Sequence, residues 1–106
     1  MQIQFNTDSS IEGTEQLAQE VEAIVSSSLG RFSSKITRLE IHLSDENSPT
    51  KSGANDKRCL LEARLAGLQP ISVRDQAATV KLAVEGAVDK LKRVLDSTLG
   101  RLGERR

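Results

Sequence analysis

The sequence QAATVKLAVEGAVDKLKRVLDSTLGRL, residues 76–102, decides the fold. Its apolar residues recur at the spacing i, i+4, i+7, i+8, i+11 and i+15, which is the pattern of one face of an α-helix. The stripe consists of Val80, Val84, Ala87, Val88, Leu91, Leu95 and Leu102. It continues for about seven turns at ~3.6 residues per turn, so this long helix needs a broad apolar surface to pack against.

Four shorter stretches before the helix alternate polar and apolar residues with a period of two, the pattern of half-buried β-strands. They are residues 2–6, 36–44, 58–65 and 68–74. The side chains expected to face the helices are Ile3, Phe5, Thr37, Leu39, Ile41, Leu43, Cys59, Leu61, Ala63, Leu65, Ile71 and Val73. Because Pro70 has no N–H to donate to a ladder, we expect the last strand at a sheet edge.

A second helix is expected between the first two strands. Thr14 is its predicted N-cap, because a hydroxyl oxygen accepts a hydrogen bond from the free amides of the first turn. Gly30 is its predicted end. Its inner face consists of Leu17, Val21, Ile24, Val25 and Ser28. Asp75 is the predicted cap of the long C-terminal helix, and a tight turn is predicted at Gly67.

The resulting order is β-α-β-β-β-α in one domain, residues 1–106. We predict an α+β fold, a two-layer sandwich in which a four-stranded sheet carries both helices on one face. Residues 45–56 contain Ser, Asn, Pro and Gly and no hydrophobic residue larger than alanine, so a mobile loop is predicted there. Residues 103–106 are predicted to form a flexible tail.

Charge is unevenly distributed along the chain. The 15 Lys and Arg residues balance 15 Asp and Glu residues, but residues 1–30 hold five acids and neither Lys nor Arg. The remaining 76 residues therefore carry 15 basic against 10 acidic residues, a net charge of +5. Such asymmetry permits one basic surface for RNA or another polyanion, although a solvated surface without a target explains it equally well.

Constellations for catalysis or metal binding are incomplete. His42 is the sole histidine and Cys59 the sole cysteine, so histidine metal sites and intrachain disulfides lack partners. Glu40 and Glu62 are expected on an open sheet face, without the cleft that acid–base catalysis needs. We predict a protein that is not an enzyme and takes no metal, cofactor or small-molecule substrate. Without a secretory signal or the ~20 apolar residues of a spanning helix, a cytoplasmic location is expected.

A binding role is better supported by the long helix. Lys90, Arg93 and Arg101 are spaced i, i+3 and i+11, so they line one edge of the helix, and Lys and Arg on a helix contact phosphates without reading sequence. Arg31 and Lys35 would join this edge if the two helices run parallel. Intrahelical pairs account for part of the pattern, since Asp89 is spaced to meet Arg93 and Lys92 to meet Asp96.

Three stretches resemble one known family. They are MQIQF at residues 1–5, DKRCLLEARL at residues 56–65 and AVEGAVDKL at residues 83–91. With the element order, they are similar to the start, third strand and second helix of the ribosome hibernation-promoting factor family, also called ribosome-associated inhibitor A or sigma-54 modulation proteins. The chain resembles its short form, without the extension that pairs ribosomes in longer relatives.

This resemblance implies a bacterial stress or stationary-phase protein, expected as a monomer, on the small ribosomal subunit. Members lodge where messenger RNA and transfer RNA would bind and thereby block initiation. The resemblance implies phosphate contacts to ribosomal RNA at Lys90, Arg93 and Arg101, with Lys57 and Arg58 as further candidates. The chain departs from the family in residues 26–28, which are serines where basic residues are usual, and in residues 76–79, which lack an aromatic residue.

Two alternatives remain open. The first is an adaptor of the same fold that binds a protein through its sheet face, where Arg38, His42, Arg58, Leu60, Arg64 and Arg74 are expected. The second is a general binder of double-stranded RNA, because domains that read RNA shape also place two helices on one sheet face.

Overall fold

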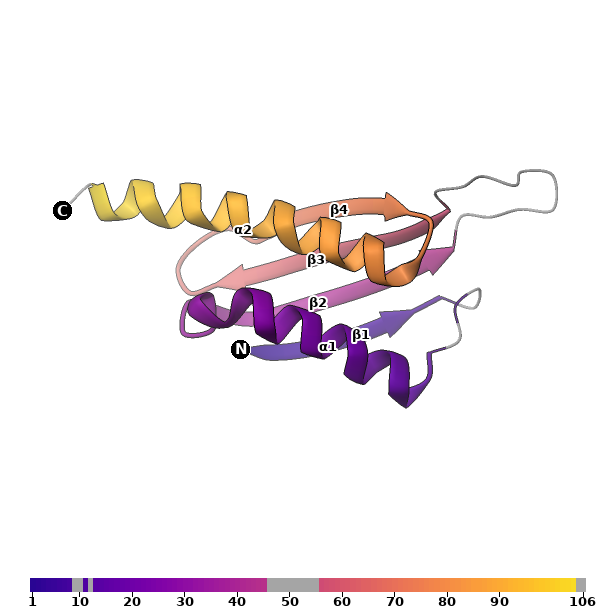
Figure 1. The fold of residues 1–106 in the computed structure, drawn as a ribbon. Helices are drawn as coiled ribbons and strands as arrows, with labels where there is room; N and C mark the ends of the chain where they lie inside the picture. The colour runs from indigo at the N-terminus through magenta and orange to yellow at the C-terminus, as the bar shows by residue number, and fades with distance from the viewer. Residues whose placement is uncertain (9–10, 12, 46–55, 105–106) are drawn as a thin grey trace.

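The computed structural model describes residues 1–8, 11, 13–45 and 56–104. The elements along the chain are β1 (Gln2–Thr7), α1 (Glu15–Leu29), the short 3-10 helix η1 (Gly30–Phe32), β2 (Ile36–Asp45), β3 (Lys57–Leu65), β4 (Ile71–Ala77) and α2 (Val80–Glu104). Figure 1 shows that α1 and α2 lie on the same face of the sheet and run in the same direction. The predicted α+β class and two-layer arrangement are confirmed.

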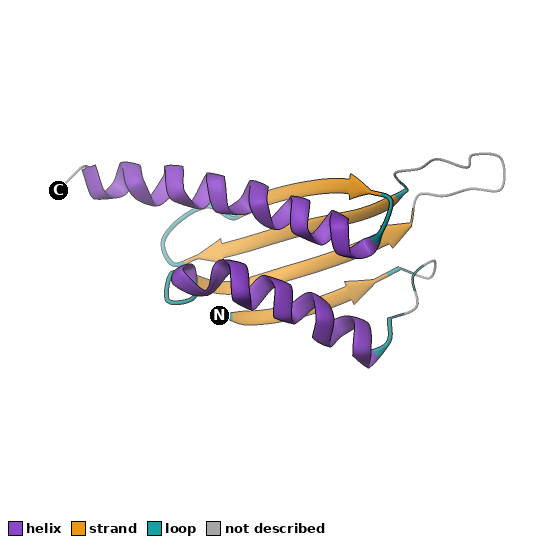
Figure 2. Cartoon of the chain, in the orientation of Figure 1, coloured by secondary structure: helices purple, strands orange, loops and turns teal. Residues whose placement is uncertain are grey.

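The four strands form one sheet in the order β1-β2-β3-β4 (Figure 2). β1 pairs with β2 in parallel, and β2–β3 and β3–β4 pair antiparallel. A parallel pair cannot be joined by a tight turn, so α1 serves as the crossover between β1 and β2. The prediction that the last strand lies at an edge is confirmed, and Gly67 takes the positive φ of 76° that its turn requires.

The core lies between the sheet and the helices and is almost wholly aliphatic. The stripe of α2 supplies Val84, Ala87, Val88, Leu91 and Leu95, all at most 1% exposed. The central strands supply their alternate residues, namely Leu39, Ile41, Leu43, Cys59, Leu61, Ala63 and Leu65. The side chains of Ile3 and Phe5 on the edge strand β1 are partly buried against this core.

Several predicted boundaries and faces are wrong. Thr37 was expected in the core, but a register shift between Ile36 and Arg38 exposes Thr37 and buries Ile36 instead. By contrast, the predicted end of the first helix at Gly30 is confirmed, since α1 ends at Leu29 with Gly30 as its C-cap, although at φ −55° the glycine continues directly into η1. Asp75 is a residue of β4, which begins at Ile71 rather than at residue 68.

The ends of α2 also differ from the prediction. The helix begins at Val80 rather than at residue 76, and the amide of Leu82 donates to Thr79 Oγ1 at 3.1 Å, so Thr79 is the capping residue. At the other end α2 continues through residues 103 and 104, which were expected in the tail. Of the predicted loop at residues 45–56, Asp45 is instead the last residue of β2. Residues 46–55 of that loop, the tail residues 105–106 and the side chain of Leu102 lie outside what the structure describes.

Candidate nucleic-acid interface

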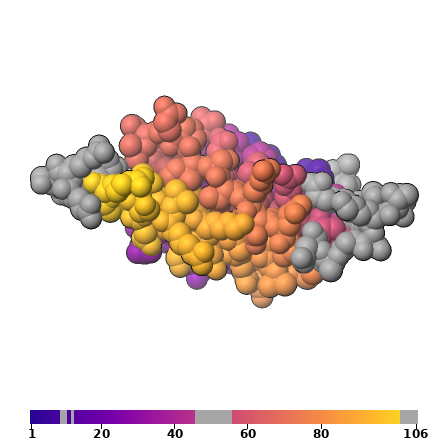
Figure 3. All heavy atoms as spheres, turned by 90° about the horizontal axis from the view of Figure 1, so that it is seen from above, coloured from indigo at the N-terminus to yellow at the C-terminus, as the bar shows by residue number. Residues whose placement is uncertain are grey.

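Lys90 is held against the sheet by two hydrogen bonds. Its Nζ lies 3.1 Å from Asp75 Oδ1 and 2.8 Å from the carbonyl oxygen of Arg74, both on β4. The lysine therefore connects α2 to the edge strand beside it, and Figure 3 shows α2 and the β3–β4 hairpin forming one continuous surface. Half of the Lys90 side chain stays exposed, but its charge already has a carboxylate partner.

Arg93 and Arg101 are the exposed arginines of α2. Arg101 Nη1 donates to Ser97 Oγ at 3.3 Å, within the same helix. Arg101 also lies in the last turn, where the helix dipole favours a positive charge. The predicted pair of Asp89 with Arg93 is not formed among the described residues, and Asp96 pairs elsewhere than with Lys92. Arg93 and Arg101 are therefore the most available cations of the predicted helix edge.

Arg31 belongs to a different part of the surface. The helices do run in the same direction, as the prediction required, but Arg31 Nη2 makes an ion pair of 2.9 Å with Asp96 on the flank of α2 that faces α1. Its guanidinium also lies over the Phe32 ring, 4.4 Å from the centroid. Arg31 thus ties η1 to α2, and it does not join Lys90 on the β4 side. Lys35 is exposed between η1 and β2.

Lys57 and Arg58 lie on opposite faces of β3 because they are adjacent residues of a strand. Lys57 Nζ is 3.2 Å from Asp45 Oδ2 and 3.0 Å from Asp56 Oδ1. The hydrogen bond to Asp56, followed by that to Asp45, raises the pKa of Lys57 above its ordinary value. With two carboxylates against it, Lys57 is poorly placed to hold a phosphate. Arg58 is on the open face of the sheet.

The helix layer presents acidic and apolar groups to solvent. All three charged residues of α1 are exposed glutamates, Glu15, Glu20 and Glu22. A groove of about 650 Å³ separates α1 from the first turn of α2 and is lined by Leu17, Glu20, Val21, Ala23, Ile24, Val80 and Lys81. The adjoining hollow includes Glu85 and Asp89. Negative charge along this groove disfavours a phosphate backbone there.

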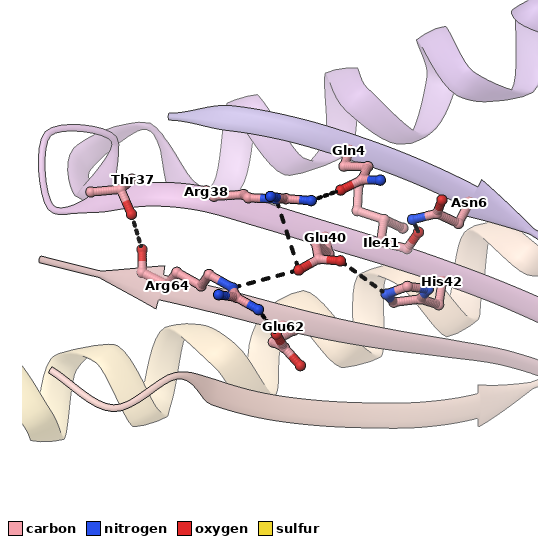
Figure 4. A network of polar contacts seen from close by, with 9 residues as sticks. All are labelled: Gln4, Asn6, Thr37, Arg38, Glu40, Ile41, His42, Glu62 and Arg64. Carbon is pink, nitrogen blue, oxygen red and sulfur yellow. Dashed lines mark hydrogen bonds and ion pairs between the residues drawn. The ribbon is translucent and has the colours of Figure 1, made fainter.

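The open face of the sheet holds a connected polar cluster, shown in Figure 4. Glu40 Oε2 lies 3.6 Å from Arg64 Nε and 3.8 Å from Arg38 Nε, and Glu40 Oε1 lies 3.8 Å from His42 Nε2. Arg38 Nη2 also donates to Gln4 Oε1 on β1, and Arg64 Nη2 donates to Glu62 Oε1 at 3.3 Å. The Glu40 carboxylate therefore lies within ion-pair distance of two arginines and of the His42 ring.

The alternation of polar and apolar residues predicts which face these side chains occupy, but it does not identify Glu40 as their common partner. Only the register Arg38↔Arg64 and Glu40↔Glu62 brings them together. Gln4 joins through the parallel pairing of β1 with β2. This pairing has no local sequence signal.

The remaining candidate for chemistry, Cys59, is part of the hydrophobic core. Cys59 is fully buried, and burial, with the nearby charge of Asp75, raises the pKa of its thiol to about 12. Among residues 1–8, 11, 13–45 and 56–104, no three His, Cys, Asp or Glu side chains are grouped closely enough to hold a metal ion. In that part of the chain, no helix combines the length and apolar character of a membrane span.

A two-layer β-α-β-β-β-α domain with charged surfaces on both layers has the form of a binding module. The chain belongs to the family described as Sigma 54 modulation protein / S30EA ribosomal protein, whose model matches residues 3–102. This membership confirms the family predicted from the sequence and gives the protein a role connected with the ribosome. No curated protein matches the chain.

Two solved structures share its fold. The N-terminal domain of protein Y from Thermus thermophilus is 20% identical, with a TM-score of 0.72, and the match covers 92% of this chain and 99% of that one. A ribosomal subunit interface protein from Coxiella burnetii is 16% identical, with a TM-score of 0.71, and the match covers 94% of this chain and 99% of that one. Low identity with high coverage shows that the architecture is shared while most residues differ.

Proposed function

We propose that this protein binds the small ribosomal subunit near the path of messenger RNA and transfer RNA and keeps ribosomes inactive under stress. The observation that carries the proposal is the family match over residues 3–102, which spans β2, β3, β4 and α1 in full and nearly all of β1 and α2. The similarity to a ribosomal subunit interface protein from Coxiella burnetii supports it. The protein would act in the cytoplasm as a monomeric single domain, without catalysis or a cofactor.

The contacts to ribosomal RNA would come first from Arg93 and Arg101. Both side chains are exposed, and neither has an ion-pair partner within the described part of the chain. Lys90 lies nearby but is shared with Asp75. Lysine and arginine contacts to phosphates release counterions, so binding weakens as salt rises. Arg31 and Lys57 contribute less, because carboxylates already neutralise them.

Co-sedimentation of the purified protein with vacant small subunits, at low and then moderate salt, tests the proposal. The wild type should travel with the subunits at both salt concentrations. The double variant R93Q/R101Q should be lost from the subunit fraction at moderate salt. The control variant K81Q/K92Q also removes two positive charges, but from the flank of α2 that faces α1, and it should bind as the wild type does. A wild-type protein that stays at the top of the gradient at both salt concentrations would refute the proposal.

A further inference from the structure

The fold separates charge between its two layers. The outward residues of the four strands include four arginines, Arg38, Arg58, Arg64 and Arg74, and two glutamates, Glu40 and Glu62. With His42 counted as neutral, the open sheet face has a net charge of +2. The helices α1 and α2 contain seven acids against five bases, a net charge of −2. The excess of positive charge is therefore on the sheet and not on the helix layer.

Two of these arginines are held in place with part of each guanidinium exposed. The side chains of Arg38 and Arg64 are 42% and 52% exposed, whereas the Glu40 side chain between them is only 16% exposed. The carboxylate thus lies beneath the two guanidinium groups and fixes them on adjacent strands. Ordering these long side chains beforehand lowers the entropy cost of binding an anion. An arginine has five N–H donors. The Nε of Arg38 is buried and makes no hydrogen bond to the residues that the structure describes, but the exposed N–H groups not used by Gln4 and Glu62 remain for a partner.

The third arginine extends the cationic surface toward the sheet edge. The register places Leu60 between His42 on one side and Arg74 on the other, so Arg74 continues the row that starts on β2. The Arg74 side chain is exposed. Its carbonyl accepts from Lys90, whose charge is paired with Asp75 at the junction of β4 and α2. Exposed arginines therefore extend from the middle of the sheet to its β4 edge.

We propose that the open sheet face docks on the phosphate backbone of an RNA duplex, with Arg38, Arg64 and Arg74 as its phosphate contacts. This inference rests on the proposed ribosomal role and names the surface that would face the RNA. Guanidinium groups bind phosphate oxygens in a two-pronged manner. A protein partner fits this face less well, because hot spots of protein interfaces are enriched in Trp and Tyr as well as Arg, and this chain has neither Trp nor Tyr. Among the side chains that the structure describes, the large hydrophobic ones that are exposed, Leu82 and Val94, are on α2.

The test compares pairs of substitutions that remove equal charge from the two layers. R64Q/R74Q acts on the sheet face, and K81Q/K92Q acts on the helix layer. Binding to a fluorescein-labelled RNA duplex of about 16 base pairs is measured as a function of salt, and co-sedimentation with small subunits is measured in parallel. We expect R64Q/R74Q to weaken duplex binding about tenfold or more and to reduce the salt slope by roughly two. K81Q/K92Q should leave both quantities unchanged within about twofold.

Folding of R64Q/R74Q is checked by circular dichroism, and R64K/R74K supplies a charge-preserving control that should bind within a few-fold of the wild type. Duplex binding that is the same in R64Q/R74Q and the wild type would overturn the inference, even if small subunits still bind. Equal weakening in R64Q/R74Q and K81Q/K92Q would also overturn it, because only net charge would then matter. Subunit binding that is lost in Leu60→Ser but kept in R64Q/R74Q would indicate a protein partner instead.

The two measurements, duplex binding and co-sedimentation with subunits, distinguish a failure of this inference from a failure of the ribosomal role. If the wild type does not sediment with subunits but its duplex binding depends on Arg64 and Arg74, the sheet face stands as an RNA surface and the ribosomal role fails. If the wild type sediments with subunits and this binding depends on Arg93 and Arg101 alone, the ribosomal role stands and the proposal for the sheet face fails.

Discussion

Asp75 joins the edge strand to the helix above it. Its Oδ1 accepts from Lys90 Nζ, and a Cβ atom on residue 86 would lie 1.7 Å from its Oδ2. The carboxylate therefore occupies the space that the absent Gly86 side chain leaves free. Asp75 is also the register partner of Cys59 and contributes to the raised pKa of that thiol. One acidic residue thus fills the space beside Gly86 and holds Lys90, and it adds to the effect of burial on the pKa of the Cys59 thiol.

Two glycines of α2 should respond in opposite ways to a methyl group. Gly86→Ala displaces the Asp75 carboxylate, and we expect the free energy of unfolding to fall by about 1–3 kcal/mol. A methyl group on residue 100 would have no neighbouring atom within 4 Å, so Gly100→Ala should raise the free energy by about 0.5–1 kcal/mol through helix propensity. Urea unfolding measures both. A Gly86→Ala variant as stabilised as Gly100→Ala would contradict the role given to the Asp75 carboxylate.

The Cys59 thiol predicts a dependence of stability on alkaline pH. In the folded protein the pKa is about 12, against an ordinary value of 9.0, so the unfolded chain loses the proton first as pH rises. The contribution of the thiol to stability is therefore complete below pH 9.0 and is lost between pH 9.0 and about 12, by up to about 1.4 kcal/mol per pH unit. Urea unfolding of the wild type and of Cys59→Ala should show a stability difference that changes over this range. A difference independent of pH would contradict the assignment.

At the scale of elements, both long helices begin with a threonine cap. Thr14 Oγ1 accepts from the amide of Leu17 at 3.0 Å, and Thr79 Oγ1 accepts from the amide of Leu82 at 3.1 Å. The prediction of Thr14 is confirmed, because it precedes a clear apolar periodicity. The prediction of Asp75 in place of Thr79 is wrong, since both residue types cap helices and the local pattern does not show where β4 ends. Pairing with β3 carries the strand on to Ala77.

The cap of α2 should therefore be sensitive at Thr79. We expect Thr79→Ala to lower the free energy of unfolding by about 1 kcal/mol, because the amide of Leu82 loses its acceptor. Thr79→Ser keeps the hydroxyl and should remain close to the wild type in the same urea titration. A Thr79→Ala variant as stable as Thr79→Ser would show that the hydroxyl does not stabilise the helix start.

At the scale of the whole molecule, two layers of opposite net charge give the protein a polarity. The open sheet face carries +2 and the two helices carry −2. Under the proposal for the sheet face, the protein lies with its sheet toward the phosphates, because every charged residue of α1 is a glutamate. The tests with R93Q/R101Q and R64Q/R74Q thus ask which side of one molecule meets the ribosome. A binding surface that extends from α2 over the β4 edge to the sheet face would explain weakened binding in both variants.

Local periodicity by itself determined the order of elements and most of the core faces, and the resemblance of three short stretches indicated the family. Leu39, Leu61 and Leu91 were placed correctly because strand and helix periods assign each side chain to a face within a few residues. The alternation also put Arg38 and Arg64 on the open face. The amount of positive charge in the last 76 residues was likewise evident from the sequence.

Only the tertiary structure decided which charges are free. Lys90 is neutralised by Asp75, 15 residues away, and Arg31 by Asp96, 65 residues away. These partners depend on strand order and on the packing of α2 against β4 and η1, which no local period specifies. The same holds for Glu40, whose contacts join β2 to β3. Ionic contacts act over a few ångströms of space, whatever the separation along the chain, so the binding surface follows from the fold and not from spacing along one helix.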